Sequence, residues 1–286
     1  MNNCYTYETL NYKQGLFDES VDVTYIITME DSIERHAHIR NELKKHQPTS
    51  QVIIVYNKGY KKCAKSYHCG EVDISYKDLT HAVMHIFDIS KDMRNILILE
   101  DDFIFNNDIA KKDIDNVTDF LGKKKPDSYS LGSIQFIVNP VSLTHRKLLA
   151  KLGTHAMIYS KNGRENLRKK FRNCSNISHD IDMLTSYPSE CYGYHKNIYA
   201  QIFSETENRS NWGKGLNYVP IFIIKAYIGF VNVISSLFGL DKEENIHKKY
   251  DNLNKSLLLL NLIVFIFMVY LFIKIIKRLK DSKSFS

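Results

Sequence analysis

The feature that most constrains this chain is an apolar run near its end, LLLLNLIVFIFMVYLFI, which covers residues 257–273 and is interrupted only by Asn261. Extended to residue 276, the run reaches the length of helix that crosses about 30 Å of hydrocarbon. Apolar side chains surround the whole helix, which disfavours the alternative of a buried helix in a soluble protein. We therefore expect a transmembrane helix at 257–276 and, at 277–286, a basic tail that contacts membrane lipid.

A second apolar segment, YVPIFIIKAYIGFVNVISSLFGL, lies within residues 217–240 and contains Lys225. It is compatible with a second span, an in-plane helix or a helix packed on a soluble domain, and we favour membrane contact. If it spans, the two segments form a helical hairpin, joined by a polar linker at 241–256. The preceding residues, 21–216, are expected to form a soluble catalytic domain.

Charge and cysteine content bound the surroundings of that domain. The net charge of +7 in a chain of 286 residues is modest and gives no indication of a nucleic-acid partner. The five cysteines are odd in number and lack CxxC spacing, so we expect reduced thiols in a cytosolic compartment. Residues 1–20 have no apolar core and are expected to be an extension, not a signal peptide. The prediction is a cytosolic domain anchored by its C-terminal end.

Apolar segments and helical patterns alternate along residues 21–216. VDVTYIIT and QVIIVYN are typical of buried strands, and the segment between them places Ile33, Ala37, Ile39 and Leu43 on one helical face. A helix at about 76–90 leads to the short strand ILIL at 96–99. Further strands are expected at 129–138 and 155–160, followed by a basic helix at 161–172 that begins after Ser160. This order predicts an α/β fold with crossover helices.

The strongest chemical signal is ILILEDDFIF, in which Glu100, Asp101 and Asp102 follow a buried strand. Adjacent carboxylates repel one another, and such a cluster persists most readily where a cation binds. Ligands of open α/β sheets bind at the carboxyl ends of the strands. A divalent ion held there neutralises charge on a leaving diphosphate, and oxygen ligands suit Mg²⁺ or Mn²⁺. The alternative interpretation is a solvated strand end.

Several segments together resemble glycosyltransferase family 25. VDVTYIITMEDSIERHAHIRNEL resembles the family's opening strand and arginine-bearing turn, and GEVDISYKDLTHAVMHIF with ILILEDDFIF resembles its helix and acidic metal motif. LGTHAMIYSKNGRENLRKKF, HDIDMLTS and YHKNIYAQIFSETENRSNW resemble its later segments, in the same order across residues 21–212. The resemblance implies a GT-A-type, Rossmann-like mixed sheet flanked by helices, and inverting transfer of a sugar from a nucleotide-sugar donor, often UDP-linked, to a hydroxyl of a glycan, protein or lipid.

The resemblance also implies residue roles at the donor site. Asp102 and Glu100 match the outer positions of the acidic motif, with Asp101 between them, and Asp102 is the expected direct ligand of Mn²⁺ or Mg²⁺. Arg35 matches the arginine after the first strand and is expected to meet the nucleotide, the alternative being a surface ion pair. His195 is a further candidate metal ligand, although a surface histidine is the simpler interpretation.

The opening turn and a later strand supply further donor-site candidates. Thr28 and Glu30 belong to a turn, Thr28-Met29-Glu30, where the family commonly has an Asn-Leu-basic sequence. Residues 56–72 depart from the family as well, because they are rich in lysine and cysteine. His155 is a candidate contact for donor or acceptor, with a core histidine as the alternative.

An inverting transfer needs a base that takes the proton of the acceptor hydroxyl, normally a carboxylate. Asp182 and Asp180 in SHDIDM are the candidates, with Asp182 preferred, and helix N-capping is the alternative for both. Gln201 and Ser204 are expected to line the acceptor site.

Two other classes of function are alternatives to the enzyme. One is a catalytically inactive glycosyltransferase-like protein that acts as a membrane interaction module, which the divergent opening turn favours. The other is phosphoryl transfer or nuclease chemistry. Dehalogenase-type phosphatases carry Asp-x-Asp after the first strand, where this chain has Thr28-Met29-Glu30, which argues against them.

Overall fold

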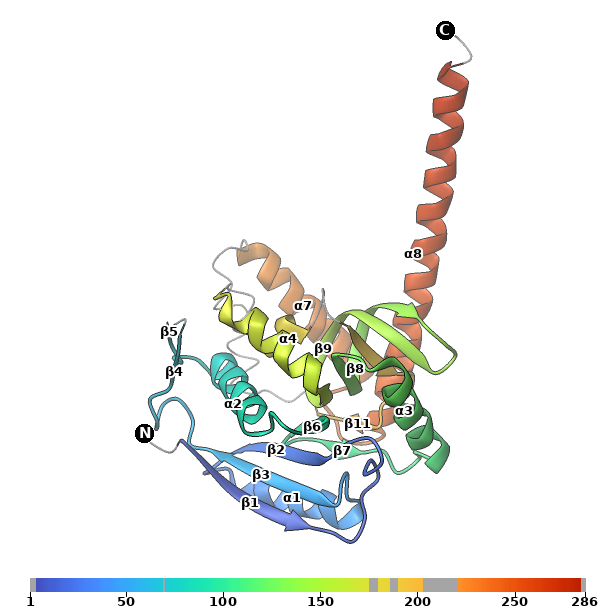
Figure 1. The fold of residues 1–286 in the computed structure, drawn as a ribbon. Coiled ribbons are helices and arrows are strands. Elements are labelled where there is room, and N and C mark those ends of the chain that lie inside the picture. Colours follow the sequence, from blue (N-terminus) through green and yellow to red (C-terminus); the bar gives the residue numbers. More distant parts are fainter. Residues whose placement is uncertain (1–3, 69, 175–179, 186–189, 203–220, 284–286) are drawn as a thin grey trace.

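The computed structural model describes residues 4–68, 70–174, 180–185, 190–202 and 221–283, which form an α/β domain from which one long helix projects (Figure 1). The strands are β1 Tyr5–Asn11, β2 Val23–Met29, β3 Gln51–Asn57, β4 Ser66–Tyr67, β5 Gly70–Glu71, β6 Asn95–Glu100, β7 Ile104–Phe105, β8 Ser128–Pro140, β9 His145–Ser160, β10 Cys191–Tyr194 and β11 Tyr199–Ala200. The helices are α1 Ile33–Lys45, α2 Ser75–Ile89, α3 Lys111–Lys124, α4 Lys161–Arg172, α5 Ile181–Thr185, α7 Ile221–Phe238 and α8 Ile246–Lys283.

Seven of the described strands form one mixed sheet in the order β1-β3-β2-β6-β9-β10-β8. Its centre is parallel, because β2 pairs in parallel with both β3 and β6. Antiparallel strands flank this centre, β1 beside β3 and β9 beside β6. The expected α/β class, a mixed sheet flanked by helices with an apolar C-terminal helix, is confirmed.

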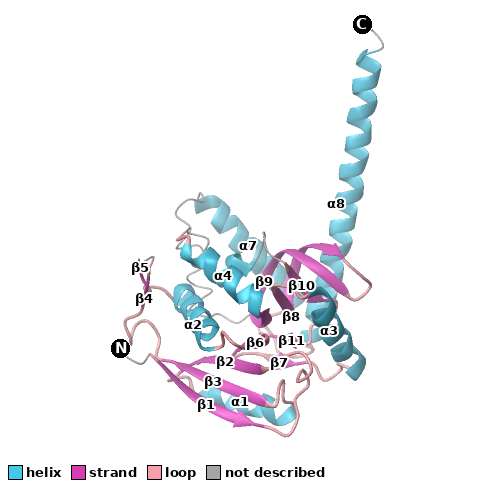
Figure 2. Cartoon of the chain, in the orientation of Figure 1, coloured by secondary structure: helices cyan, strands magenta, loops and turns pink. Residues whose placement is uncertain are grey.

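Helices cover both faces of the sheet (Figure 2). Successive side chains of a strand point to opposite faces, so on β6 Ile96 and Ile98 pack with residues of α2, α4 and α5, while Leu97 and Leu99 pack with residues of α1 and α3. Burial on both faces explains why this strand is apolar without alternation.

Several elements differ from the sequence-based expectation, including the strands β4, β5, β7, β10 and β11, which were not expected. Further differences concern β1, α3 and β9. Residues 5–11, expected to precede the domain, form the edge strand β1. The sequence did not predict helix α3, because most of its residues are polar. Only a short stripe is apolar and buried, and it consists of Ile114, Val117 and Leu121. Strand β9 begins at His145, well before the expected residue 155, because it pairs with β8 along most of its length.

The two apolar C-terminal segments are both helical. Helix α8 begins at Ile246, so its first turns are formed by residues that were expected to belong to the linker. The part Ile246–Ile276 is apolar and long enough to cross a membrane. Helix α7 packs on the domain through Val231 and Ile234, which are buried. One of the three expected arrangements, a helix packed on the domain, is therefore present, and this packing leaves Phe230, Val233 and Leu237 exposed.

Candidate functional site

The carboxyl ends of β2, β3 and β6 meet at one edge of the sheet. The register places Met29 opposite Asn57, and Ile27 opposite Glu100. The chain turns sharply after Glu100, where the N–H of Phe103 donates to the Glu100 carbonyl at 3.2 Å. Phe103 itself is fully buried and anchors the turn. This edge is where an open α/β sheet binds its ligands.

A cavity of about 570 Å³ opens at this edge, a size typical of small-molecule sites. Most of the predicted site residues line it, namely Thr28, Arg35, Glu100, Asp101, Asp102, Asp182 and Gln201. Asp182 comes from α5, so carboxylates from two segments far apart in the sequence share one cavity. The acidic triplet therefore lines a cleft at the end of the strand, and its three residues are half-buried.

Crowding in this cavity makes the charged form of the carboxylates costly. Burial is the main cause that raises the pKa of Glu100 well above its ordinary value, and the charges of Asp102, Asp182 and Asp101 add to it. The pKa of Asp102 is raised to about 6, by burial first and then by the charge of Asp101. A cation bound among these groups would relieve both penalties.

Two of the three consecutive carboxylates already have partners. The Thr28 hydroxyl donates to Asp101 at 2.7 Å, and the Arg35 guanidinium lies 3.9 Å from the same carboxylate. Burial raises the pKa of Asp101, while Thr28 and Arg35 oppose that rise. The Thr154 hydroxyl donates to Glu100 at 3.2 Å. These contacts fix the orientation of both acids.

The cavity offers part of the ligand shell of a divalent ion. Asp102 Oδ1 is buried and has no hydrogen-bond partner among the described residues. Among those same residues, no three His, Cys, Asp or Glu side chains converge as a complete metal shell. Mg²⁺ is commonly held by one or two carboxylates together with water and substrate phosphates. The free oxygen of Asp102 in a cluster of like charges fits such a partial shell.

The loop after β3 also lines the cavity, with Lys58, Gly59, Tyr60, Lys61 and Lys62. Its course favours glycine at one point, because Gly59 has φ +76°. Cationic residues in the same cavity as the carboxylates suit a ligand that carries phosphate.

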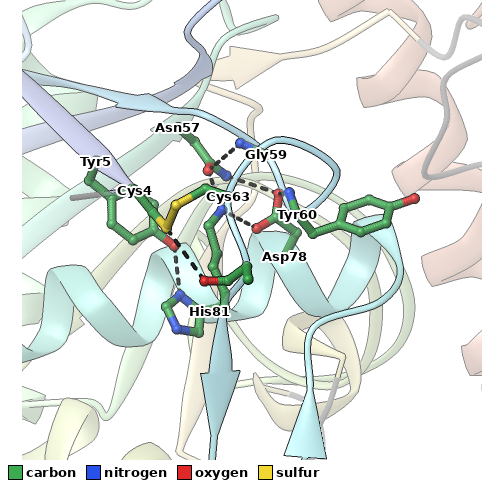
Figure 3. Close-up of polar contacts among 10 residues, drawn as sticks. Cys4, Tyr5, Asn57, Gly59, Tyr60, Cys63, Asp78 and His81 are labelled. Carbon is green, nitrogen blue, oxygen red and sulfur yellow. Dashed lines mark hydrogen bonds and ion pairs between the residues drawn. A yellow bond between two sulfur atoms is a disulfide. The ribbon is translucent and has the colours of Figure 1, made fainter. Parts of the chain in front are cut away.

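A buried polar network holds this loop (Figure 3). The ammonium of Lys65 donates to both Asn57 and Asp78. Asp78 in turn accepts from the backbone N–H of Tyr60 at 3.2 Å, and Asn57 accepts from the N–H of Gly59 at 2.9 Å. Burial lowers the pKa of Lys65, an effect that its bond to Asp78 opposes.

A disulfide between Cys4 and Cys63 joins the end of the loop to the segment that leads into β1 (Figure 3). Cys174 is also disulfide-bonded, and Cys191 is free and buried. The expectation of reduced thiols is therefore wrong for Cys4, Cys63 and Cys174. Pairing depends on tertiary proximity, which an odd count of cysteines and their spacing do not reveal.

Four predicted site residues do not line the cavity. Glu30 is exposed and meets Thr6 at 3.5 Å. Asp180 accepts from the N–H of Asp182 at 2.8 Å, so it acts as the N-terminal cap of α5, the alternative considered for it. Ser204 lies outside the described residues.

The other two predicted site residues that do not line the cavity are His155 and His195. His155 is fully buried beside Tyr250, and burial lowers its pKa to about 3, as for a core histidine. The ring of His195 packs against Tyr194, and its backbone N–H donates to the Thr144 carbonyl at 2.9 Å. Neither histidine lines the cavity, and the structure does not bring His195 to the acidic cluster.

Sequence reasoning missed the wall formed by residues 57–62 and its support at Asp78. One signal was present, since Asn57 ends a strand next to the first strand, where parallel strands bring their carboxyl ends together. The lysines of the loop were attributed to divergence from the family. Gly153 and Thr154 line the cavity from the strand antiparallel to β6. They lie in the segment LGTHAMIYS that resembles the family, but nothing in that segment marked these two residues as part of the site.

No protein-family model matches the chain, and no curated protein matches it. Among solved structures, the crystal structure of A197 from STIV is similar over 65% of this chain and 86% of its own, at 11% identity and a TM-score of 0.37. The crystal structure of a glycosyltransferase involved in the glycosylation of the major capsid of PBCV-1 is similar over 59% of this chain and 71% of its own, at 9% identity and a TM-score of 0.29. Both TM-scores are below 0.5, and the function is therefore argued from the cavity residues.

Proposed function

We propose that the chain is a membrane-anchored, metal-dependent glycosyltransferase that moves a sugar from a nucleotide-sugar donor, UDP-linked in the simplest case, to a hydroxyl acceptor with inversion. The carrying observation is that Glu100, Asp101, Asp102 and Asp182 face one cavity at the carboxyl ends of the central parallel strands. The resemblance to family 25 supports the same assignment.

The donor diphosphate fits a cavity that holds both acidic and cationic residues. The acidic part includes Asp102, whose free oxygen suits Mn²⁺ or Mg²⁺, with Glu100 beside it. The loop after β3 adds Lys58 and Lys61 to the same cavity, and Arg35 lies 3.9 Å from Asp101. The ion, when bound, would neutralise negative charge on the departing diphosphate. Thr28 and Thr154 would hold the carboxylates in place through their existing hydrogen bonds.

Asp182 is the base that we propose for the acceptor. It lies in the first turn of α5 and lines the cavity, and Lys151 approaches it at 3.6 Å. A carboxylate there would take the proton from the acceptor hydroxyl as the sugar is transferred. Gln201 lines the same part of the wall and would orient the acceptor.

We propose that the domain faces an oxidising compartment. Disulfides persist in such compartments and are rare in cytosolic proteins. The pair Cys4–Cys63 and the bonded Cys174 therefore favour the lumenal or extracellular side over the cytosolic side expected from the sequence. Protease treatment of sealed vesicles distinguishes the two orientations, because a lumenal domain is protected and a cytosolic one is digested.

The function is tested with the full chain reconstituted in lipid nanodiscs. A panel of nucleotide-sugars is incubated with Mn²⁺, with Mg²⁺ or with a chelator, and release of nucleoside diphosphate is measured. We expect release from one donor class only when the divalent ion is present. If no donor is cleaved and none binds by calorimetry with metal present, the inactive interaction module is the better description.

Asp182→Asn separates the base from the donor site. Because the amide cannot accept the hydroxyl proton, transfer to the acceptor is expected to fall about a hundredfold or more, while donor affinity with metal stays within about threefold. Calorimetry gives the affinity, and product formation gives the rate. Asp180→Asn is the matched control, since its side chain does not line the cavity. Equal losses in the two variants would contradict the role given to Asp182.

A further inference from the structure

Helix α8 is docked on the domain before it becomes apolar. Ile246, Tyr250 and Leu253 are buried in a cluster with β8, β9 and α7. Asn254, also buried, accepts from the N–H of Gln135 at 2.9 Å and donates to the Ser133 carbonyl at 3.0 Å. Packing and hydrogen bonds therefore fix the direction in which the helix leaves the domain (Figure 1).

The docked part and the apolar part overlap. Leu257 is buried in the same cluster, and Asn261 donates to the Phe136 carbonyl of β8 at 2.8 Å. Both residues belong to Leu257–Ile276, which rises about 30 Å and is no longer than the hydrocarbon core requires. If this stretch spans the bilayer, the part of the domain that touches Asn261 has to lie at the level of the lipid headgroups.

The structure exposes apolar side chains next to this contact and farther along α7. Ile137 follows the strand residue that Asn261 contacts, and half of its surface is exposed. Phe230 of α7 approaches Phe136 with ring centroids 6.3 Å apart, and it is also exposed. Val233 is 56% and Leu237 75% exposed on the same helix.

Helix α7 has a buried and an exposed apolar side. Its inner side buries Val231 and Ile234 against the domain, while Phe230, Val233 and Leu237 form an exposed stripe at helical spacing. An exposed apolar stripe of this kind is typical of a surface that contacts a membrane or another protein.

We propose that Ile137, Phe230, Val233 and Leu237 form a membrane face, which inserts into the headgroup–acyl boundary of the bilayer that α8 crosses. The occupant is lipid because the face adjoins the point where α8 emerges from the domain. In-plane apolar helices bury their apolar side by about 5–10 Å at this boundary. This inference concerns how the domain sits on the bilayer and is independent of its catalytic activity.

The test uses tryptophan as a depth probe in the full chain, with the single native tryptophan removed as Trp212→Phe. Val233→Trp and Leu237→Trp report on the membrane face, and Tyr270→Trp reports on the middle of α8. Ile33→Trp is the matched control, an exposed apolar position of α1, which lies at the end of the molecule away from the projecting helix (Figure 1). Each variant is reconstituted in two sets of vesicles, whose phosphatidylcholine is brominated either near the headgroup end or near the middle of its acyl chains.

We expect the emission of Val233→Trp and Leu237→Trp to shift to the blue and to fall about twofold or more relative to unbrominated lipid. Ile33→Trp should be unaffected. Quenching of Tyr270→Trp without quenching of the two membrane-face variants would overturn the proposal. An emission that is blue-shifted, insensitive to bromine and lost on dilution into excess lipid would show a second copy on this face, and would overturn it too. The proposal also fails if Tyr270→Trp is not quenched.

Discussion

Asp102→Asn is expected to lower metal-dependent release of nucleoside diphosphate at least about a hundredfold, the usual loss when a preorganised electrostatic group is removed. The amide keeps the shape of the side chain but removes the charge that we propose for holding Mn²⁺ or Mg²⁺. Donor turnover in nanodiscs gives the rate, and calorimetry with metal gives the donor affinity. Asp115→Asn is the matched control, because Asp115 is an exposed acid on α3 outside the cavity.

The same substitution is expected to raise thermal stability in the absence of metal. The pKa of Asp102 is about 6 in the folded protein, above its ordinary value of 3.8. Between these values the folded state binds more protons than the unfolded state, so the parent loses stability as the pH rises from about 4 to 6. Asparagine carries no charge and avoids this loss.

Thermal midpoints with chelator, measured at pH 5 and at pH 7.5, check the sign. We expect the midpoint of Asp102→Asn to exceed that of the parent at pH 7.5, and the difference to shrink at pH 5. Added Mn²⁺ should raise the midpoint of the parent at pH 7.5 and leave that of the variant unchanged. Full activity in Asp102→Asn would show that the cluster binds no catalytic ion.

Removing the disulfide, as Cys4→Ala with Cys63→Ala, is expected to destabilise the domain. The bond closes a separation of 59 residues, and the loop-closure relation gives about 4 kcal/mol for a loop of this length. For a domain of this size that corresponds to a fall of about 10 °C in the thermal midpoint. Donor binding should weaken as well, because the loop that ends at Cys63 lines the cavity from Lys58 to Lys62.

A double-mutant cycle separates the bond from the two side chains. Cys4→Ala alone and Cys63→Ala alone each break the same bond, so each single variant should lose nearly as much stability as the double variant. Thermal midpoints under oxidising conditions measure this. Losses that add between the two singles would indicate that the cysteines act by packing, and that the bond does not stabilise the loop.

The central strands could be predicted from sequence because strands that are buried on both faces of a sheet consist mostly of apolar residues. β2, β3 and β6 are apolar without alternation, since helices cover both faces of the sheet. Helix α4 matched its predicted bounds, and Ser160 caps it by accepting from the N–H of Gly163 at 3.0 Å. β1 could not be predicted in the same way, because it is an edge strand whose exposed residues alternate with buried ones.

The candidate site was predictable where it follows a strand and unpredictable where it depends on tertiary contacts. Glu100, Asp101 and Asp102 were found because an acidic triplet at the end of a buried strand is costly. The support of the loop after β3 is non-local, since Lys65 donates to Asp78 on α2 and Cys63 is bonded to Cys4 at the start of the chain. Asp180 and Asp182 have similar sequence surroundings, and only the fold of α5 assigns one to capping and the other to the cavity.

Because α8 runs as one helix from Ile246, buried in the domain, to Lys283, it contains no flexible hinge at the point where we propose that the domain meets the lipid. A tether made of flexible residues would let the domain sample many heights and tilts. If α8 crosses the bilayer as proposed, the mouth of the cavity would be held at one height above the bilayer and in one direction. Acceptors fixed in the same membrane would then be sorted by the height of their hydroxyl group, whereas dissolved acceptors would not be sorted at all.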